Sequence, residues 1–365
     1  MTHAKWSETG NRKEWNDFVA HNGGTIFHTW AWEKVLENDQ RKPAYLVCRD
    51  EDGRILAVCP FMSTLSRRFR YLDSLPRSFI AGPVIAKEAS DTEKIIRSLF
   101  RSAKLSPLHF PHLVREIYVK VHREELVKPM IALGFPYKIE YGLFITDLEE
   151  KPPEHIWNSG FQKHDRQAVK YYEQRGAVFR FAAQESDYDD YLALGEGATF
   201  HPYHGPDFFS KMRLGLGDKL KVALVAIDGK VTAGAMLICD PDASTVHMAT
   251  MRYSNVKNIH SPVTHINWRV VDWAAQNRFR YVDFGLWLAD HVSDPSHFAY
   301  KMKSRFEATF FPIHEFTLRP SGIIYSMARR VNRLMLRVRR VKERGNPGLA
   351  PTTRLSSRYL PSQIA

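Results

Sequence analysis

The segment that decides the fold is SPVTHINWRVVDWAAQNRFRYVDFG, residues 261–285. Ser261 is a suitable N-cap, and Pro262 suits the first position of a helix. Apolar residues then recur three and four positions apart from Val263 to Ala274. This periodicity predicts an amphipathic helix that packs one face against a core.

The helix is followed by a predicted strand, because residues 279–284 alternate between apolar and polar side chains. The strand ends in Asp283-Phe284-Gly285, which places a carboxylate at the lip of a sheet beside a glycine. Another strand is predicted before the helix, over residues 245–251. The order strand, helix, strand indicates a unit of mixed α and β structure.

The two halves of the chain show the same order of predicted elements. Each half has a helix, then a hairpin whose turn contains an acidic residue and a glycine, and then a second helix and a strand. In the first half these are the helix 29–37, hairpin strands 45–48 and 54–62 around Asp52-Gly53, helix 92–104 and strand 116–121. In the second half they are the helix 187–194, hairpin strands 221–227 and 231–239 around Asp228-Gly229, strand 245–251, helix 263–276 and the strand at Tyr281.

The segment from YVDFG to FAYKMKSRFEATFFP (residues 298–312) resembles the C-terminal half of Fem-type peptidyltransferases of the GNAT acyltransferase superfamily. Those proteins show a DFG strand end and then an F-K-x-x-F-G-A segment. Lys303, Phe306 and Ala308 stand at the matching positions, whereas Met302 and Glu307 depart from the pattern. Residues 161–179 are similar to the family's basic K-x-x-R helix, and residues 25–38 to its N-terminal F-x-T-x-x-W helix.

This resemblance covers about residues 15–320 and implies an α+β protein of tandem GNAT-like domains, with mixed β-sheets flanked by helices. We expect the two hairpins at corresponding places in two superposable sheets. The predicted parts are an N-terminal GNAT-like domain (1–147), a C-terminal GNAT-like domain (148–320), a basic amphipathic helix (321–345) and a flexible tail (346–365). A charged, proline-bearing stretch at residues 147–153 suggests the boundary between the domains.

The resemblance implies an N-acyl or aminoacyl transferase that acts on an amine of a cell-envelope precursor, in peptidoglycan biogenesis. Two alternatives stay open: an acyl-CoA or acyl-thioester dependent N-acyltransferase on a small amine, and a non-catalytic binding protein on the same fold. CoA-dependent relatives bind the pyrophosphate through a glycine-rich turn before a helix, but residues 251–263 contain no glycine. We therefore expect no resident cofactor, and the donor is either an aminoacyl-tRNA or an acyl thioester.

The candidate catalytic residue is Asp283, which would orient or deprotonate the acceptor amine, although an aspartate at a turn also serves to bind backbone N–H groups. The resemblance places a substrate-contacting lysine at Lys303. Three further candidates are aromatic or histidine side chains in loops that could line an acceptor pocket: Trp287, Tyr203 and His204. Two more, Lys163 and Arg166, are basic residues on one helix face that could bind phosphate. Local packing or a solvated helix face accounts for each of these as well.

Three other chemistries are disfavoured. A protein kinase needs a glycine-rich loop, a strand lysine and a His-Arg-Asp loop, and the sequence has none of them beside its DFG. His201 and His204 have the spacing of metal ligands, but no further pair completes a site, so no metal is predicted. A cysteine nucleophile is disfavoured, because Cys48, Cys59 and Cys239 lie in apolar runs, which indicates buried free thiols in a reducing cytoplasm.

Positive charge is concentrated at the C-terminal end. Residues 321–365 carry ten Lys or Arg against one Glu, which is nine of the twelve net positive charges of the chain. Residues 323–344 alternate apolar and basic positions at helical spacing, so we expect an amphipathic helix that binds an anionic membrane surface through Arg329, Arg330, Arg333, Arg337, Arg340 and Arg344. A tRNA backbone and packing on the first domain are the alternatives.

The expected location is therefore the cytoplasm, at the inner face of the cell membrane. The first residues, Met1–Asn16, are polar and lack the apolar region of a secretory signal.

Overall fold

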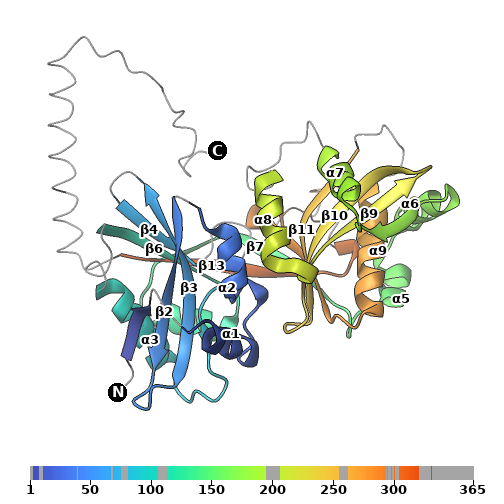
Figure 1. Cartoon of the computed structure of the whole chain (residues 1–365). Helices are drawn as coiled ribbons and strands as arrows, with labels where there is room; N and C mark the ends of the chain where they lie inside the picture. Colours follow the sequence, from blue (N-terminus) through green and yellow to red (C-terminus); the bar gives the residue numbers. More distant parts are fainter. Residues whose placement is uncertain are drawn as a thin grey trace, which may run out of the picture. The chain divides into compact units, whose positions relative to one another are not determined.

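A computed structural model describes residues 3–7, 11–38, 40–66, 69–74, 81–105, 113–194, 206–254, 262–292 and 304–319, with the single residues 294, 297, 300 and 330 (Figure 1). Residues up to Arg319 form one compact unit. The predicted basic helix and tail lie outside the described residues except for Arg330. The predicted boundary between residues 147 and 148 stays a prediction.

Thirteen described strands form the sheet. They are β1 (His3–Ser7), β2 (Arg41–Arg49), β3 (Ile55–Ser66), β4 (Phe69–Asp73), β5 (Val84–Ile85), β6 (Leu113–Val121), β7 (Tyr137–Asp147), β8 (Val178–Phe181), β9 (Leu220–Ile227), β10 (Lys230–Asp240), β11 (Thr245–Tyr253), β12 (Tyr281–Leu288) and β13 (Thr309–Leu318). Their spatial order is β1-β2-β3-β4-β6-β13-β7-β12-β11-β10-β9-β8, with β5 beside β3.

The directions of strand pairing follow the same pattern from both edges of the sheet. From each edge inward, three antiparallel pairings are followed by one parallel pairing, β4 with β6 in the first half and β11 with β12 in the second. The next strand inward is antiparallel again, β13 in the first half and β7 in the second. The tandem GNAT-like architecture is thus confirmed, and the two hairpins, β2-β3 and β9-β10, occupy corresponding places.

The expectation of two separate sheets is wrong, because β7 and β13 join the halves edge to edge. The strand that follows the first half, β7, pairs with β12 of the second half, and the last strand, β13, pairs with β6 of the first. β7 and β13 also pair with each other, so hydrogen bonding continues across the junction (Figure 1). The first half of the sheet is thus completed by β13, which follows the second half in the sequence, and the second half by β7, which follows the first half.

Helices cover both faces of the sheet. The helical segments are α1 (Arg12–His21), η1 (Ile26–His28), α2 (Trp30–Leu36), α3 (Thr92–Leu105), α4 (Glu124–Ala132), α5 (Pro153–His155), η3 (Ile156–Gly160), α6 (Lys163–Gln174), α7 (Glu185–Ala193), α8 (Pro206–Leu216), η5 (Gly217–Lys219), α9 (Pro262–Gln276) and η6 (Ala289–His291). In the first half α3 and α4 cover one face, where Phe100 and Met130 pack on Leu46 and Ile117. Trp15 and Trp30, from α1 and α2, pack with Tyr45 in a second cluster.

In the second half, α9 lies along β9, β10, β11 and β12 on one face of the sheet, beside α6 (Figure 1). Its apolar stripe buries Ile266, Val270 and Ala274 against Val246 and Val282. The predicted helix is therefore confirmed, and it begins at Pro262 as proline at a first helical position favours. The other face of this sheet packs against η1, α2, α7 and α8.

Among the described residues, no helix is long and apolar enough to cross a membrane.

Candidate functional site

The parallel strands β11 and β12 part from each other, and the candidate site lies where they do. They pair at only three positions, from Thr245 opposite Tyr281 to His247 opposite Asp283. Both strands continue beyond this point, β11 to Tyr253 and β12 to Leu288, without further pairing between them. The paired segment ends at His247 and Asp283, which stand side by side on the two strands.

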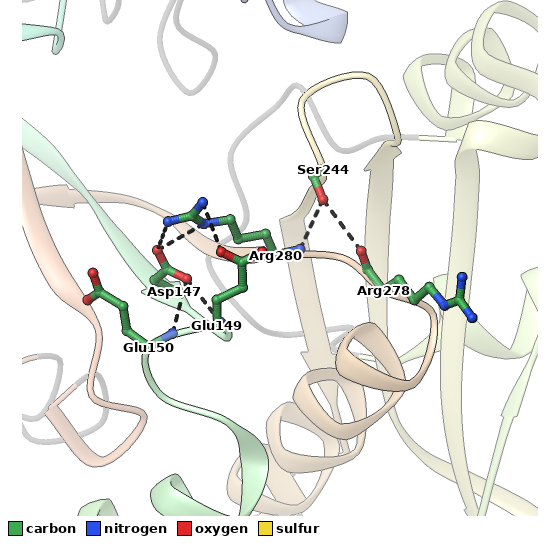
Figure 2. Close-up of polar contacts among 6 residues, drawn as sticks. All are labelled: Asp147, Glu149, Glu150, Ser244, Arg278 and Arg280. Atoms are coloured by element: carbon green, nitrogen blue, oxygen red, sulfur yellow. Dashed lines mark hydrogen bonds and ion pairs between the residues drawn. The ribbon is translucent and has the colours of Figure 1, made fainter.

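The closed end of the strand pair is held by a polar clamp (Figure 2). The Ser244 carbonyl accepts the N–H groups of Arg280 and Tyr281, each at 3.0 Å, and the Ser244 hydroxyl accepts the Arg280 N–H at 3.1 Å. The Arg280 guanidinium binds the carboxylates of Asp147, at the end of β7, and of Glu149. This guanidinium lowers the pKa of Asp147, although partial burial acts in the opposite direction. The clamp therefore fixes β11, β12 and β7 at one end.

The open end is shaped by Gly285. Its φ of 85° lies in the left-handed region that glycine adopts without strain, and a Cβ there would lie 3.3 Å from the Met248 carbonyl oxygen. The register between β12 and β7 shifts between Asp283 and Leu286, as in a β-bulge. The bulge interrupts the pairing of β12 with β7 directly after Asp283, while Gly285 still lies close to the β11 backbone at Met248.

The His247 and Asp283 side chains are hydrogen-bonded to each other. The His247 Nδ1 atom lies 2.9 Å from Asp283 Oδ2, and Asp283 Oδ1 accepts the Gly285 N–H at 2.8 Å. The side chains are 12% and 8% exposed, so the bond is shielded from water. The His247 Nε2 atom is buried and has no hydrogen-bond partner among the described residues. A carboxylate on Nδ1 favours the tautomer that keeps the proton there and leaves Nε2 free to accept one.

Two residues from the first half face this pair. The Phe27 ring of η1 lies 4.6 Å from the His247 ring, centroid to centroid. His122, directly after β6, is close enough to interact electrostatically with both Asp283 and His247. Burial and the charge of Arg123 lower the pKa of His122 to about 4, although the Asp283 carboxylate acts to raise it. His122 is therefore neutral near pH 7.

The predicted site residues fall into four groups. Asp283 accepts the Gly285 N–H, as an aspartate at a turn does, and it also bonds to His247. Trp287 is on β12 but packs against the α9-side core, and its Nε1 donates to the Phe284 carbonyl at 3.3 Å. Tyr203, His204 and Lys303 lie outside the described residues.

The basic helix α6 carries the remaining two candidates. Lys163, its first residue, is exposed. Arg166 is half-buried, and its Nη1 donates to the backbone carbonyl oxygens of Trp157 and Phe161. In this structure Arg166 thus connects α6 to the π-helical segment η3, whereas Lys163 projects toward solvent.

Sequence reasoning missed His247, Phe27 and His122. One signal for His247 was present, because a histidine interrupts the otherwise apolar or hydroxyl-bearing run Thr245–Thr250. The register that sets it beside Asp283 depends on pairing between strands 36 residues apart, which no local pattern encodes. No cluster of three or more metal-binding side chains occurs in the part of the chain that the structure describes.

A cavity of about 250 Å³ lies next to η1. Its walls come from the end of α1, from Thr25 and Ile26, and from Leu216, Asp240 and Asp242 of the second half. Asp240 is buried, and its Oδ2 accepts the Ile26 N–H at 2.6 Å. Neither His247 nor Asp283 lines this cavity.

Comparison with known proteins finds a family model that matches part of the second half. Residues 159–302 match the family model of the acetyltransferase (GNAT) domain. This segment contains α9, β11 and β12, and so both His247 and Asp283. No curated protein has a significant sequence match to the chain.

Solved structures give the fold of the whole described unit. A crystal structure of FemX is similar at a TM-score of 0.67, with 15% identity, over 88% of this chain and 99% of that one. A tandem GNAT protein from the clavulanic acid biosynthesis pathway has a TM-score of 0.55, with 12% identity, over 87% and 98%. The C-terminal domain of a putative lysylphosphatidylglycerol synthetase from Agrobacterium fabrum has a TM-score of 0.52, with 14% identity, over 87% and 93%. The predicted resemblance to Fem-type GNAT proteins is thereby confirmed at the level of the fold.

Proposed function

We propose that this chain, which contains a GNAT acyltransferase domain, transfers an acyl or aminoacyl group to an amine of a cell-envelope precursor, at the parting of β11 and β12. The observation that carries the proposal is the largely buried His247–Asp283 pair at the end of the β11–β12 pairing, with the Nε2 atom of His247 unpartnered among the described residues. Acyl transfer to an amine requires a group that removes a proton from nitrogen, and a carboxylate-oriented imidazole supplies one.

The chemistry follows from that pair. The acceptor amine attacks the acyl carbonyl carbon, and the new N–C bond forms as His247 Nε2 takes a proton from the nitrogen. The Asp283 carboxylate holds the Nδ1–H and stabilises the imidazolium that results. The C–O bond to a tRNA ribose or the C–S bond of a thioester then breaks, and the imidazolium returns its proton to the leaving oxygen or sulfur. No oxidant, metal or further reactant is needed for this balance.

The likeness in fold to FemX and to the domain of a putative lysylphosphatidylglycerol synthetase supports an aminoacyl donor and an envelope precursor or lipid as acceptor. One observation favours a second candidate, an acyl-CoA donor: a similar tandem GNAT protein is named with reference to AcCoA.

The test is to incubate the full chain with charged tRNA or with a set of acyl-CoAs, together with candidate envelope amines, and to detect the product by mass spectrometry. Product with charged tRNA only supports the aminoacyl function, and product with acyl-CoA only supports the second candidate. If neither donor yields product with any amine, the alternative of a non-catalytic binding protein is favoured. The variant His247→Gln serves as control, because it keeps a polar side chain of similar size without the base.

We further propose that Lys303, Trp287, Tyr203 and His204 contact the acceptor, and that Lys163 and Arg166 meet phosphate groups of a substrate. The exposure of Lys163 supports its part in this, and the backbone contacts of Arg166 limit what it can offer without rearrangement. Lys303→Ala is expected to raise the KM for the acceptor with little effect on stability, since surface substitutions usually change stability by less than about 0.5 kcal/mol. An unchanged KM for the acceptor excludes Lys303 from the acceptor site.

A cytoplasmic location at the inner face of the membrane is proposed from the basic segment after residue 320. Each basic residue near an anionic leaflet contributes on the order of 1 kcal/mol. The measurement is co-sedimentation with vesicles of phosphatidylglycerol and phosphatidylcholine. A chain ending at Pro320 should lose the binding that the full chain shows, and equal binding by both chains contradicts a membrane role for Arg329, Arg330, Arg333, Arg337, Arg340 and Arg344.

A further inference from the structure

The short helix η1 connects the two halves of the molecule next to the site. On the first-half side, Trp15 Nε1 donates to the His28 carbonyl at 2.6 Å, and His28 Nε2 lies 3.2 Å from the Gly82 carbonyl oxygen. His28 Nδ1 accepts the Thr25 N–H at 3.0 Å, which leaves the proton on Nε2 for Gly82. Burial lowers the pKa of His28 to about 3, so this neutral, doubly bonded imidazole is a fixed part of the first half.

On the second-half side, η1 is held by Asp240 at the end of β10. This carboxylate is 1% exposed, and it accepts the Ile26 N–H through Oδ2 at 2.6 Å and the Ala243 N–H through Oδ1 at 3.2 Å. A hydrogen bond between a buried carboxylate and a backbone N–H is among the stronger kinds in proteins. The position of η1 relative to β10 and β11 is therefore fixed from both halves.

Phe27 lies between these two anchors and presents its ring to His247. The ring planes meet at 58°, and Phe27 is in turn packed edge-on against Trp32, with a centroid distance of 5.1 Å. Phe27 is 6% exposed. A rigid aromatic wall on one side of an imidazole limits the rotation of that ring and keeps water from its bond with the carboxylate.

We propose that Phe27 is a positioning residue for the base His247, so that the first half supplies the wall against which the acid–base pair of the second half is held. The chain of contacts runs from Asp240 through η1 to Phe27, and from there to His247 and Asp283. The inference rests on the proposed function in that His247 must act as the base. It adds that the GNAT domain depends on a residue about 130 positions before the matched segment begins.

The test compares Phe27→Leu with Phe209→Leu in the full chain. Phe209 belongs to the same core cluster and is 5% exposed, which matches the burial of Phe27, but its ring packs against Tyr188 and Tyr191. Both variants remove an aromatic ring from one core, so both should lower Tm to a similar extent. Only Phe27→Leu should change the state of the His247 imidazole.

Two measurements distinguish positioning from plain packing. The first is the proton NMR signal of the His247 Nδ1–H, assigned with His247→Gln, which should be visible in the wild type and in Phe209→Leu but lost to solvent exchange in Phe27→Leu. The second is the rate of acyl transfer, in which Phe27→Leu should lower kcat about tenfold or more at unchanged KM, because small displacements of a reacting group have effects of this size. Asp240→Asn should also weaken the Nδ1–H signal of His247, and it provides the test if Phe27→Leu does not fold.

A retained Nδ1–H signal together with wild-type kcat in both Phe27→Leu and Asp240→Asn overturns the proposal. Loss of the signal in Phe27→Leu but not in Phe209→Leu supports it even without a substrate, because the signal is read from the unreacted protein. If that loss occurs while His247→Gln keeps full transfer activity, the positioning contact is supported and the proposed role of His247 as base fails. The two failures are therefore separable.

Discussion

The parallel strand pairs of the two halves, β4 with β6 and β11 with β12, occupy the same place in the strand order but differ in how far they stay together. β4 is paired with β6 along its whole length, from Phe69 to Asp73, and Ser74 extends the contact to Tyr118 and Lys120. β11 leaves β12 after three of its nine residues. One pair is closed and the other is open.

Each pair carries a carboxylate bonded to a basic side chain on the neighbouring strand. In the closed pair, Lys120 Nζ binds both carboxylate oxygens of Asp73, at 3.0 and 3.1 Å. In the open pair, His247 binds Asp283. A lysine keeps its proton near neutral pH, whereas a histidine exchanges one. The duplicated fold thus pairs a carboxylate with a lysine where the strands stay together and with a histidine where they part, which is why the proposed chemistry is placed in the second half.

Removing the carboxylate of the open pair should have the largest effect on function. Asp283→Asn keeps the shape but no longer fixes the Nδ1–H of His247, so we expect kcat/KM for acyl transfer to fall about 100-fold or more. The matched variant Asp73→Asn should retain the wild-type kcat/KM. A comparable loss of activity in Asp73→Asn would mean that both strand pairs take part in the chemistry.

Breaking the closed pair should mainly affect stability. Lys120 is 9% exposed, and burial raises the pKa of Asp73 even though Lys120 acts to lower it. Lys120→Met leaves that partly buried carboxylate, 25% exposed, without its partner, and we expect a loss of about 2 kcal/mol in the free energy of unfolding, measured with urea. The double variant Lys120→Met/Asp73→Asn should recover part of this loss, because no uncompensated charge is then buried. Additive losses would contradict a coupled pair.

Acid should destabilise the protein through His28, which is buried in the folded state. The pKa of His28 is lowered to about 3 by burial, so the unfolded chain binds a proton below about pH 6.5 while the folded chain does not. The free energy of unfolding should therefore fall as pH decreases from about 6.5 toward 4, by about 1 kcal/mol per pH unit for this imidazole.

The comparison is between the slopes of stability against pH. His28→Asn should show a shallower slope than the wild type over this range, whatever its absolute stability. Equal slopes would indicate that His28 is protonated in the folded protein and does not fix η1 in the way its hydrogen bonds suggest.

The clamp at the closed end of β11 and β12 should have the smallest effect. Ser244→Ala removes the hydroxyl that accepts the Arg280 N–H, and a single hydrogen bond contributes about 1 kcal/mol. Hydrogen exchange at the Tyr281 amide should become faster as the strand ends loosen. Ser254, at the other end of β11, donates to the Thr232 carbonyl at 3.2 Å, so Ser254→Ala is the control that should leave Tyr281 unchanged. Faster exchange in both variants would point to a general loss of stability.

Much of the fold was predictable from local pattern. The helix at residues 263–276, both hairpins and the strand that carries Asp283 were expected and lie within a few residues of the observed bounds. Periodicity and turn residues report such elements because the forces that shape them act between near neighbours in the chain. The cysteines Cys48, Cys59 and Cys239 are buried and free, also as their apolar surroundings predicted.

The candidate site was predictable only in part. Asp283 was identified by its place before Gly285, but Trp287 turned out to pack with the α9-side core. His247 was not singled out, since its importance comes from a register between two strands that meet only in the folded chain.

The sequence by itself determined the helices near residues 29–37, 92–104, 187–194 and 263–276, the two hairpins, the repeated order of these elements and the carboxylate at a strand end, because these follow from spacing along the chain. Tertiary structure decided that β7 and β13 join two halves in one sheet, that β11 and β12 part after His247, and that Phe27 faces that histidine. These features depend on strand register and on contacts between distant segments. Each is set by burial and hydrogen bonding of the whole unit, so no short stretch of sequence contains the information.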